Sequence, residues 1–173
     1  LLFRRHNHAL QFGAPADADE MTRFGQSIPD WPAFPDSRPA LTYLHKFYQL
    51  IILSNVDRTS FAASATKLGV DFNAVYTAQD IGSYKPDVRN FDYLIAQVAE
   101  RGYDKSDILH VAQSLYHDHG PARSRGLASA WIDRRGDQAG GGATKPVGSD
   151  VRYDFRFASL ADLADAHRAE MGS

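Results

Sequence analysis

The hydrophobic residues of this chain gather in short continuous runs that longer amphipathic stretches separate. The clearest run, Leu50–Leu53, contains no polar residue and stops abruptly at Ser54 and Asn55. A run of this length without alternation predicts a strand that is buried on both faces, as in a parallel sheet covered by helices. Further strands are predicted at 74–77, 108–112 and 128–132, and an edge strand at 155–157.

Helical patterns fill the stretches between these runs. They predict helices over 1–12, 17–26, 36–47, 58–68, 86–101, 118–125 and 160–171, with loops at 78–85 and at the glycine-rich 137–150. Glycines stand where several of these helices should end, and Pro86 stands in the expected first turn of another. Strands that alternate with helices of this size indicate right-handed βαβ units. The predicted fold class is therefore α/β, with a doubly wound, Rossmann-like parallel sheet.

A proline-punctuated aromatic segment divides the chain. Residues 30–36 read Asp-Trp-Pro-Ala-Phe-Pro-Asp, which cannot form a helix. We place a boundary there, with a helical module at 1–30 and an α/β module at 31–173.

Composition excludes several classes of function. The net charge of −2 and a pI near 6.4 offer no electrostatic argument for nucleic acid or an anionic membrane as a partner. The chain has no cysteine, which excludes a thiol nucleophile and fits a reducing compartment, so we expect a cytoplasmic protein. No apolar run approaches the roughly 20 residues that a membrane span needs.

Polar groups follow the carboxyl ends of three predicted strands, which is where open parallel sheets bind ligands. The first loop starts with Ser54 and Asn55, and the second contains Ser83, Tyr84 and Lys85. Hydroxyls and free backbone N–H groups at a helix start can hold an anion, and Lys85 can act as its counter-ion. The alternatives are that Ser54 and Asn55 only cap a helix and that Lys85 is an ordinary surface lysine.

The third loop carries Gln113, Ser114 and the run His117-Asp118-His119. The two histidines suggest a metal, but no third ligand is identifiable, and Asp118 is also a good helix cap. A hydrolytic serine lacks its G-x-S-x-G motif, and the glycine run near Lys145 lacks the spacing of a phosphate-binding loop.

These three loops, in this order, resemble the haloacid dehalogenase superfamily, closest to its type II (L-2-haloacid dehalogenase-like) branch. The matching motifs are Leu-Ser-Asn at 53–55, Ser-Tyr-Lys-Pro-Asp at 83–87, His-Val-Ala-Gln-Ser at 110–114 with Asp118, Trp-Pro-Ala-Phe-Pro-Asp at 31–36 and Trp-Ile-Asp-Arg at 131–134. The resemblance implies a Rossmann-like core with a small helical cap, of which residues 1–30 are the remainder.

The resemblance also implies a mechanism and roles. An aspartate on the first core strand attacks the substrate and forms an ester that water then cleaves. Lys85 balances the charge, Ser54 binds substrate or nucleophile, and Asp118 fixes Lys85 or a water. The expected substrate contacts come from a larger set, namely Asn55, Ser83, Tyr84, Ser114 and Phe91.

The chain departs from the family pattern at the nucleophile, because the D-x-x-G-T type motif that precedes the cap is absent. The strand that carries it is central in the family, between the strands near Leu50 and Ile108, so its loss would expose two unpaired edges. We therefore expect an N-terminally truncated chain that is inactive and compromised in folding as written.

The substrate residues depart as well. Phe91 stands where the dehalogenases have tyrosine, and Gln113 stands where the phosphatase branch has a magnesium-binding aspartate. A neutral amide weakens a site for a hard cation. The leading hypothesis is a cofactor-free hydrolase that acts on a small anionic 2-halo or other 2-substituted carboxylic acid. The alternatives are a magnesium-dependent phosphatase and a non-catalytic truncated module, and a homodimer through an apolar cap face stays open.

Overall fold

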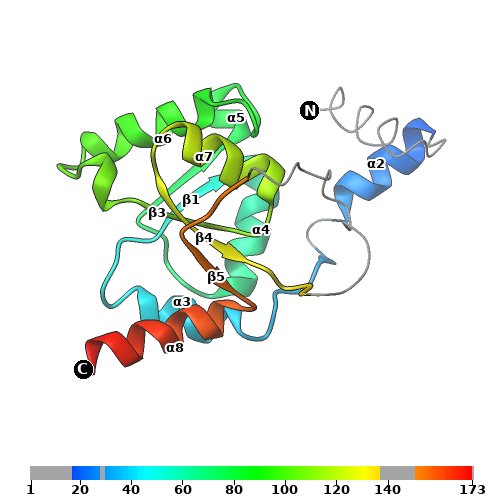
Figure 1. The fold of residues 1–173 in the computed structure, drawn as a ribbon. Coiled ribbons are helices and arrows are strands. Elements are labelled where there is room, and N and C mark those ends of the chain that lie inside the picture. The colour runs from blue at the N-terminus through cyan, green and yellow to red at the C-terminus, as the bar shows by residue number, and fades with distance from the viewer. Residues whose placement is uncertain (1–16, 28–29, 137–150, 173) are drawn as a thin grey trace.

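A computed structural model describes residues 17–27, 30–136 and 151–172 of the chain, and it shows an α/β fold with parallel strands (Figure 1). The elements are α2 (Ala18–Gln26), α3 (Ser37–Leu44), β1 (Ile51–Ser54), α4 (Arg58–Leu68), β2 (Ala74–Thr77), α5 (Ala78–Ile81), α6 (Arg89–Ala99), η2 (Lys105–Asp107), β3 (Leu109–Ala112), η3 (Leu115–His119), α7 (Gly120–Ser124), β4 (Ala128–Ile132), β5 (Phe155–Phe157) and α8 (Leu160–Met171). The predicted helix over 1–12 and the predicted loop over 137–150 lie outside the described residues.

Local signals in the sequence account for several of these elements. Helix α4 begins where the Asp57 carboxylate accepts a hydrogen bond from Ser60 N, and it ends at Gly69 in the left-handed conformation at φ 59°. In α6, Phe91, Leu94 and Val98 lie on one buried face, as their helical spacing requires. The predicted bounds of α4, β2, β4, β5 and α8 are confirmed.

Three helix predictions need correction. A short helix, α5, lies inside the predicted loop over 78–85, because Thr77 and Asp80 form a reciprocal capping box. Helix α6 begins at Arg89 rather than at Pro86, since Asp87 N donates to Tyr84 O in a turn that precedes it. Helix α3 ends at Leu44, three residues before the predicted end at Phe47.

The strands form two parallel sheets rather than one. In the first, β1 pairs with β2 in register Leu53↔Tyr76, and in the second the order is β3-β4-β5. No described strand lies between β1 and β3, which is the position where the sequence predicted a strand to be missing. Both strands therefore present a backbone edge that no described strand pairs.

Side chains rather than backbone hydrogen bonds hold the two sheets together. Helices α6 and α7 lie on one side of the strands, and α3 and α8 lie on the other (Figure 1). Phe91 of α6 and Ala122 of α7, both 0% exposed, pack with Leu53 of the first sheet and Ile108 at the start of the second. The core therefore continues across the gap between the sheets.

Helix α2 carries the predicted cap remainder. Figure 1 shows it apart from the body of the protein, and Lys67 of α4 donates a hydrogen bond to Trp31 O just after it. The boundary near residue 30 stays a prediction. Among the described helices, none is long and apolar enough to cross a membrane.

Asp36 ties α3, the end of β4 and α8 together. Its carboxylate accepts two hydrogen bonds from the Arg134 guanidinium, at 2.9 and 3.1 Å, and further ones from Leu160 N and Ala161 N at the start of α8. Partial burial raises the pKa of Asp36, but Arg134 and the helix N–H groups offset this, so the pKa lies below its ordinary value of 3.8.

We expect Asp36→Asn to lower the free energy of unfolding by about 2 kcal/mol at pH 7, because charge-assisted hydrogen bonds are lost. The contribution of Asp36 is present above its unfolded-state pKa and disappears as the pH falls through the lowered folded-state value. Urea denaturation between pH 7 and pH 3 measures both effects. The matched control is Asp165→Asn, at an exposed pair with Arg168, which should change stability by less than about 0.5 kcal/mol. Equal effects of the two substitutions would contradict the assignment.

Candidate active site

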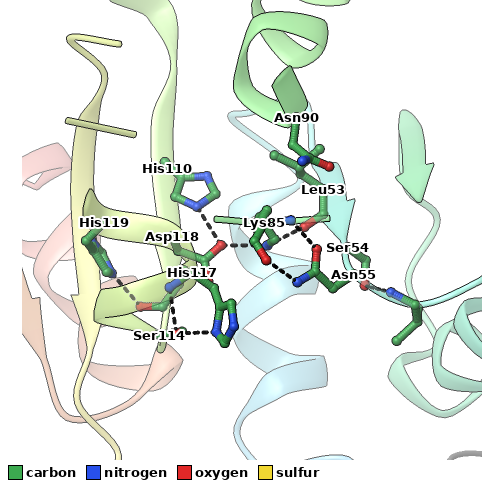
Figure 2. A network of polar contacts seen from close by, with 12 residues as sticks. Leu53, Ser54, Asn55, Lys85, Asn90, His110, Ser114, His117, Asp118 and His119 are labelled. Atoms are coloured by element: carbon green, nitrogen blue, oxygen red, sulfur yellow. Dashed lines mark hydrogen bonds and ion pairs between the residues drawn. The ribbon is translucent and has the colours of Figure 1, made fainter. Parts of the chain in front are cut away.

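The candidate site lies at the carboxyl ends of β1 and β3, on either side of the gap between the sheets. Lys85 enters this gap from the loop between α5 and α6, and Asp118 enters it from η3 (Figure 2). Two segments that are 33 residues apart in sequence thus meet at one point.

Lys85 and Asp118 form a buried ion pair. Lys85 Nζ donates to Asp118 Oδ1 at 2.5 Å, and the two side chains are 11% and 8% exposed. Lys85 Nζ also donates to Leu53 O of β1 at 2.8 Å. A buried charge is tolerated when it is paired and hydrogen-bonded, as both charges are here. The ammonium consequently connects β1, at the edge of the first sheet, with the helical turn η3 that follows β3.

Asp118 stays ionised in this environment. Burial by itself raises the pKa of its carboxyl group, but the charge of Lys85 and the hydrogen bonds from His110 and Lys85 overcome burial, so the pKa lies well below its ordinary value of 3.8. At neutral pH Asp118 is therefore present in the site as a carboxylate.

Asn55 holds the backbone of Lys85 at two points. Its Nδ2 donates to Lys85 O at 2.9 Å, and its Oδ1 accepts from Lys85 N at 2.7 Å. This clamp fixes the loop from which the lysine side chain extends, so the Ser-Asn motif after β1 positions Lys85. Contact between Asn55 and a substrate stays a prediction, because each end of the amide keeps one further hydrogen-bonding position.

The turn that follows β3 is a π-helix, and this corrects the predicted helix over 118–125. In η3, Gly120 N donates to Leu115 O and His119 N donates to Ser114 O, both with the wide spacing of a π-turn. The Ser114 hydroxyl caps this turn by accepting from His117 N at 3.1 Å. The wide turn places Asp118 toward Lys85 and the adjacent His119 in the core. Helix α7 then begins at Gly120.

His110 is a site residue that the sequence analysis did not select. It lies on β3, and its Nε2 lies 3.1 Å from Asp118 Oδ1. Its signal in the sequence is a histidine in the middle of an otherwise apolar run, at 108–112. A buried polar side chain in such a strand needs a partner, and here the partner is Asp118.

The other predicted residues are placed as follows. Ser54, at the end of β1, accepts a hydrogen bond from Val56 N at 3.4 Å. Ser83 is buried and accepts from Asn90 Nδ2 of α6 at 3.1 Å, and Tyr84 in the same loop is half-buried. Phe91 is 0% exposed and packs its ring against His110, with ring centroids 5.1 Å apart. The expected contact of Phe91 with substrate stays a prediction, and in the described part of the chain its ring faces the core and His110.

The two histidines that flank Asp118 are engaged within the protein. His119 Nε2 donates to Ala112 O at 3.0 Å, so its Nδ1 is the acceptor for the Ser129 hydroxyl at 3.1 Å. Burial lowers the pKa of His119, which fits a neutral ring. His117 Nδ1 lies 3.0 Å from the Ser114 hydroxyl. Among the described residues, no group of three or more His, Cys, Asp or Glu side chains is arranged to hold a metal ion.

Comparison with known proteins identifies the fold. No model of a protein family matches the sequence, and no curated protein matches it. The L-2-haloacid dehalogenase from Xanthobacter autotrophicus with chloropropionic acid covalently bound is similar with a TM-score of 0.74 and 19% identity, over 95% of this chain and 74% of that one. The L-2-haloacid dehalogenase PA0810 is similar with a TM-score of 0.68 and 21% identity, over 95% of this chain and 68% of that one. The HAD phosphatase from Thermococcus onnurineus is similar with a TM-score of 0.63 and 22% identity, over 92% of this chain and 68% of that one.

The chain thus has the haloacid dehalogenase-like fold, with its Rossmann-like α/β core. Lys85, Asp118 and Ser54 lie at the carboxyl ends of its strands, where such folds bind ligands. The similarity in structure spans about two thirds to three quarters of the length of these neighbours.

We expect Lys85→Met to lower the free energy of unfolding by about 3 kcal/mol at pH 7, because it leaves the Asp118 carboxylate buried without its ammonium partner. The double variant Lys85→Met/Asp118→Asn should be more stable than the sum of its two single variants implies, since neither charge is then left alone. Denaturation of the four proteins forms a double-mutant cycle.

The exposed ion pair of Arg89 with Asp87 provides the control, because its loss should change stability little. Additive effects at Lys85 and Asp118 would contradict the description of the two side chains as a buried pair.

Proposed function

We propose that this chain is the core of a haloacid dehalogenase-like hydrolase that acts on a small 2-substituted carboxylic acid, such as a 2-halo acid, through an aspartyl ester. The observation that carries the proposal is the buried ammonium of Lys85, held at the carboxyl end of β1 by Leu53 O and Asp118. The lysine, serine and asparagine motifs support the type II, L-2-haloacid dehalogenase-like branch of the superfamily.

Lys85 supplies the positive charge that this chemistry requires. A lysine ammonium has three donors, and in the described part of the chain two of them are used, by Leu53 O and Asp118 Oδ1. The third is available to an anionic group at the strand ends. Because the ammonium is buried and fixed in place, it stabilises negative charge more strongly than a solvated lysine does.

The gap between β1 and β3 suits a strand that carries the nucleophile. Leu109 and Val111 of β3 are 44% and 37% exposed, although they belong to a strand of apolar composition. A parallel strand in the gap would pair with both edges and cover apolar surface. Its carboxyl end would then lie beside Ser54 and Lys85. We propose that the nucleophilic aspartate stands at that end.

Asp36 and Asp118 are engaged in other contacts, and we do not propose either of them for this role. Asp36, which follows the cap segment, is bonded to Arg134 and to the start of α8. Asp118 is bonded to Lys85 and His110. The nucleophile is thus proposed to come from a segment that the described residues do not include.

The proposed reaction has two steps. A carboxylate oxygen of the nucleophile bonds to C2 of the substrate while the carbon–halogen bond breaks and halide leaves with its electron pair. Water then attacks the carbonyl carbon of the ester, which releases the 2-hydroxy acid, restores the carboxylate and delivers one proton to solvent. Asp118 can orient this water. Lys85 Nζ and His110 Nε2 both bond to Asp118 Oδ1, so in the described part of the chain Oδ2 has no donor and can accept a hydrogen bond from the water.

Two other functions remain to be separated by experiment. A magnesium-dependent phosphatase would use Asp118 and the added aspartate as carboxylate ligands, but Gln113 offers a neutral side chain where a third carboxylate would serve. A non-catalytic module would bind an anion at Lys85 without turnover. We further propose that the protein is cytoplasmic, and a homodimer through the cap stays a proposal.

The first experiment establishes the native N-terminus by intact mass and terminal sequencing, and then assays that polypeptide with L-2-chloropropionate. We expect an upstream apolar strand ending in aspartate, and release of chloride that a chelator does not affect. Release of phosphate from phosphate esters that a chelator abolishes would favour the phosphatase instead. Turnover by a polypeptide with the 19.2 kDa mass of this sequence would overturn the proposed mechanism.

In the active polypeptide, Lys85→Met should lower kcat/KM for halide release by about 100-fold or more, because a fixed charge at the reacting carboxylates is lost. Lys105→Met removes an exposed lysine of η2 and serves as the matched control, with an unchanged rate expected. A Lys85→Met variant that is folded and fully active would show that the charge is not needed.

A further inference from the structure

His110 is a buried polar residue to which neither the proposed reaction nor the resemblance assigns a role. It is one of the core-facing residues of β3, where alternate residues point to opposite sides. Leu109 and Val111 point to the exposed side, and His110 is 9% exposed. An apolar residue would satisfy this position in a strand by packing alone. The presence of an imidazole therefore calls for a polar role.

The partner of the His110 ring determines which of its two nitrogens is protonated. His110 Nε2 lies 3.1 Å from Asp118 Oδ1, and Asp118 is ionised, so a carboxylate oxygen is the acceptor. Nε2 must then be the donor. The ring of Phe91 meets the imidazole at an interplanar angle of 73°, and this edge contact holds the ring in its orientation.

His110 and Lys85 together fix the orientation of the Asp118 carboxylate. Both donate to the same oxygen, Oδ1, from opposite sides of the gap, His110 from β3 and Lys85 from the loop before α6 (Figure 2). An oxygen that accepts two fixed donors cannot exchange places with Oδ2 without breaking both hydrogen bonds. The second oxygen is therefore kept in one direction, as a water-orienting acceptor requires.

His119, which is next to Asp118 in the sequence, cannot replace His110 as a donor to the carboxylate. The ring nitrogens of His119 bond to Ala112 O and to the Ser129 hydroxyl, so neither is directed to the carboxylate. His110 is thus the histidine that contacts Asp118 in the described part of the chain.

We propose that His110 is a positioning residue that acts through Asp118: its Nε2–H anchors Oδ1, so that Asp118 holds Lys85 at the end of β1 and keeps Oδ2 in one orientation. The consequence for catalysis rests on the proposed hydrolase function. The contact itself does not, and it can be tested on the native polypeptide without substrate.

The test is NMR of the isotopically labelled native polypeptide, with the N-terminus established above, and of two variants of it. His110→Phe keeps a ring against Phe91 and removes the donor, whereas His110→Gln removes the ring and keeps an N–H donor of similar reach. In the unmodified chain we expect the His110 proton on Nε2, protected from exchange. His110→Phe should shift the Asp118 carboxyl carbon signal and broaden or remove the Lys85 ammonium signal, and His110→Gln should restore both.

The results separate positioning from packing. If His110→Phe leaves both signals unchanged, or if His110→Gln behaves like His110→Phe, the histidine only packs and the proposal fails. If His110→Phe does not fold, the unmodified chain still decides, because a neutral His110 with its proton on Nδ1 would overturn the proposal.

A kinetic measurement on the active polypeptide then tests the consequence for catalysis. We expect His110→Phe to lower kcat for halide release about tenfold with little change in KM, and His110→Gln to recover most of the loss. Unchanged kcat in a folded His110→Phe variant would overturn a role in catalysis. Absence of halide release from the unsubstituted polypeptide would instead count against the hydrolase proposal, and the NMR result would stand apart from it.

Discussion

The ion pair between Lys85 and Asp118 is the interaction on which the rest of the site depends. It crosses the gap between two sheets that no described strand joins, and it reaches β1 through Leu53 O. Two buried charges so close together are mutually required, because removal of either leaves the other desolvated and unpaired. Other polar contacts of the site support this pair. Asn55 fixes the backbone of Lys85, the π-turn directs Asp118 toward Lys85, and His110 Nε2 bonds to the same oxygen of Asp118 as Lys85 does.

The apolar core supports the same junction from one side. Phe91 and Ala122 fill the space between α6, α7 and the two sheets, so the sheets keep a relative position that their backbones do not determine. In one continuous sheet, backbone hydrogen bonds would hold β1 and β3 at a fixed distance, whereas here two kinds of side-chain contact do so. Side-chain packing sets the distance between β1 and β3, and a charge pair occupies the polar end of the gap. A gap between parallel strands that ends at a fixed ammonium is chemically suited to an aspartate-bearing strand, and this is the physical basis of the proposed hydrolase.

The similarity to solved structures agrees with this picture at the level of the fold. Dehalogenases and a phosphatase of the same fold overlay comparably well on this chain, with TM-scores between 0.63 and 0.74. The dehalogenases and the phosphatase thus share one fold with different chemistries. The proposed metal-independent reaction rests instead on side chains, namely a neutral Gln113 and an Asp118 that is bound to Lys85.

The sequence by itself determined the local elements and the residue types of the site. Helix α4 could be placed from Asp57 and Gly69, since a cap and a left-handed glycine act within one turn of the chain. Strands β2 and β4 could be placed from their apolar runs, and Ser54, Lys85 and Asp118 from their positions after strands. The Thr77–Asp80 capping box that starts α5 was also readable, although the loop prediction overlooked it.

Only the tertiary structure decided what these residues do to one another. The contacts of Asn55 with the Lys85 backbone and of Lys85 with Asp118 join positions that are 30 and 33 residues apart. The contact of His110 with Asp118 depends on a π-turn that local propensity does not predict. Phe91 packs against His110 because α6 turns that face to the core. Local hydrogen bonds follow from neighbours along the chain, whereas the partner of a buried charge follows from which strand ends the fold brings together.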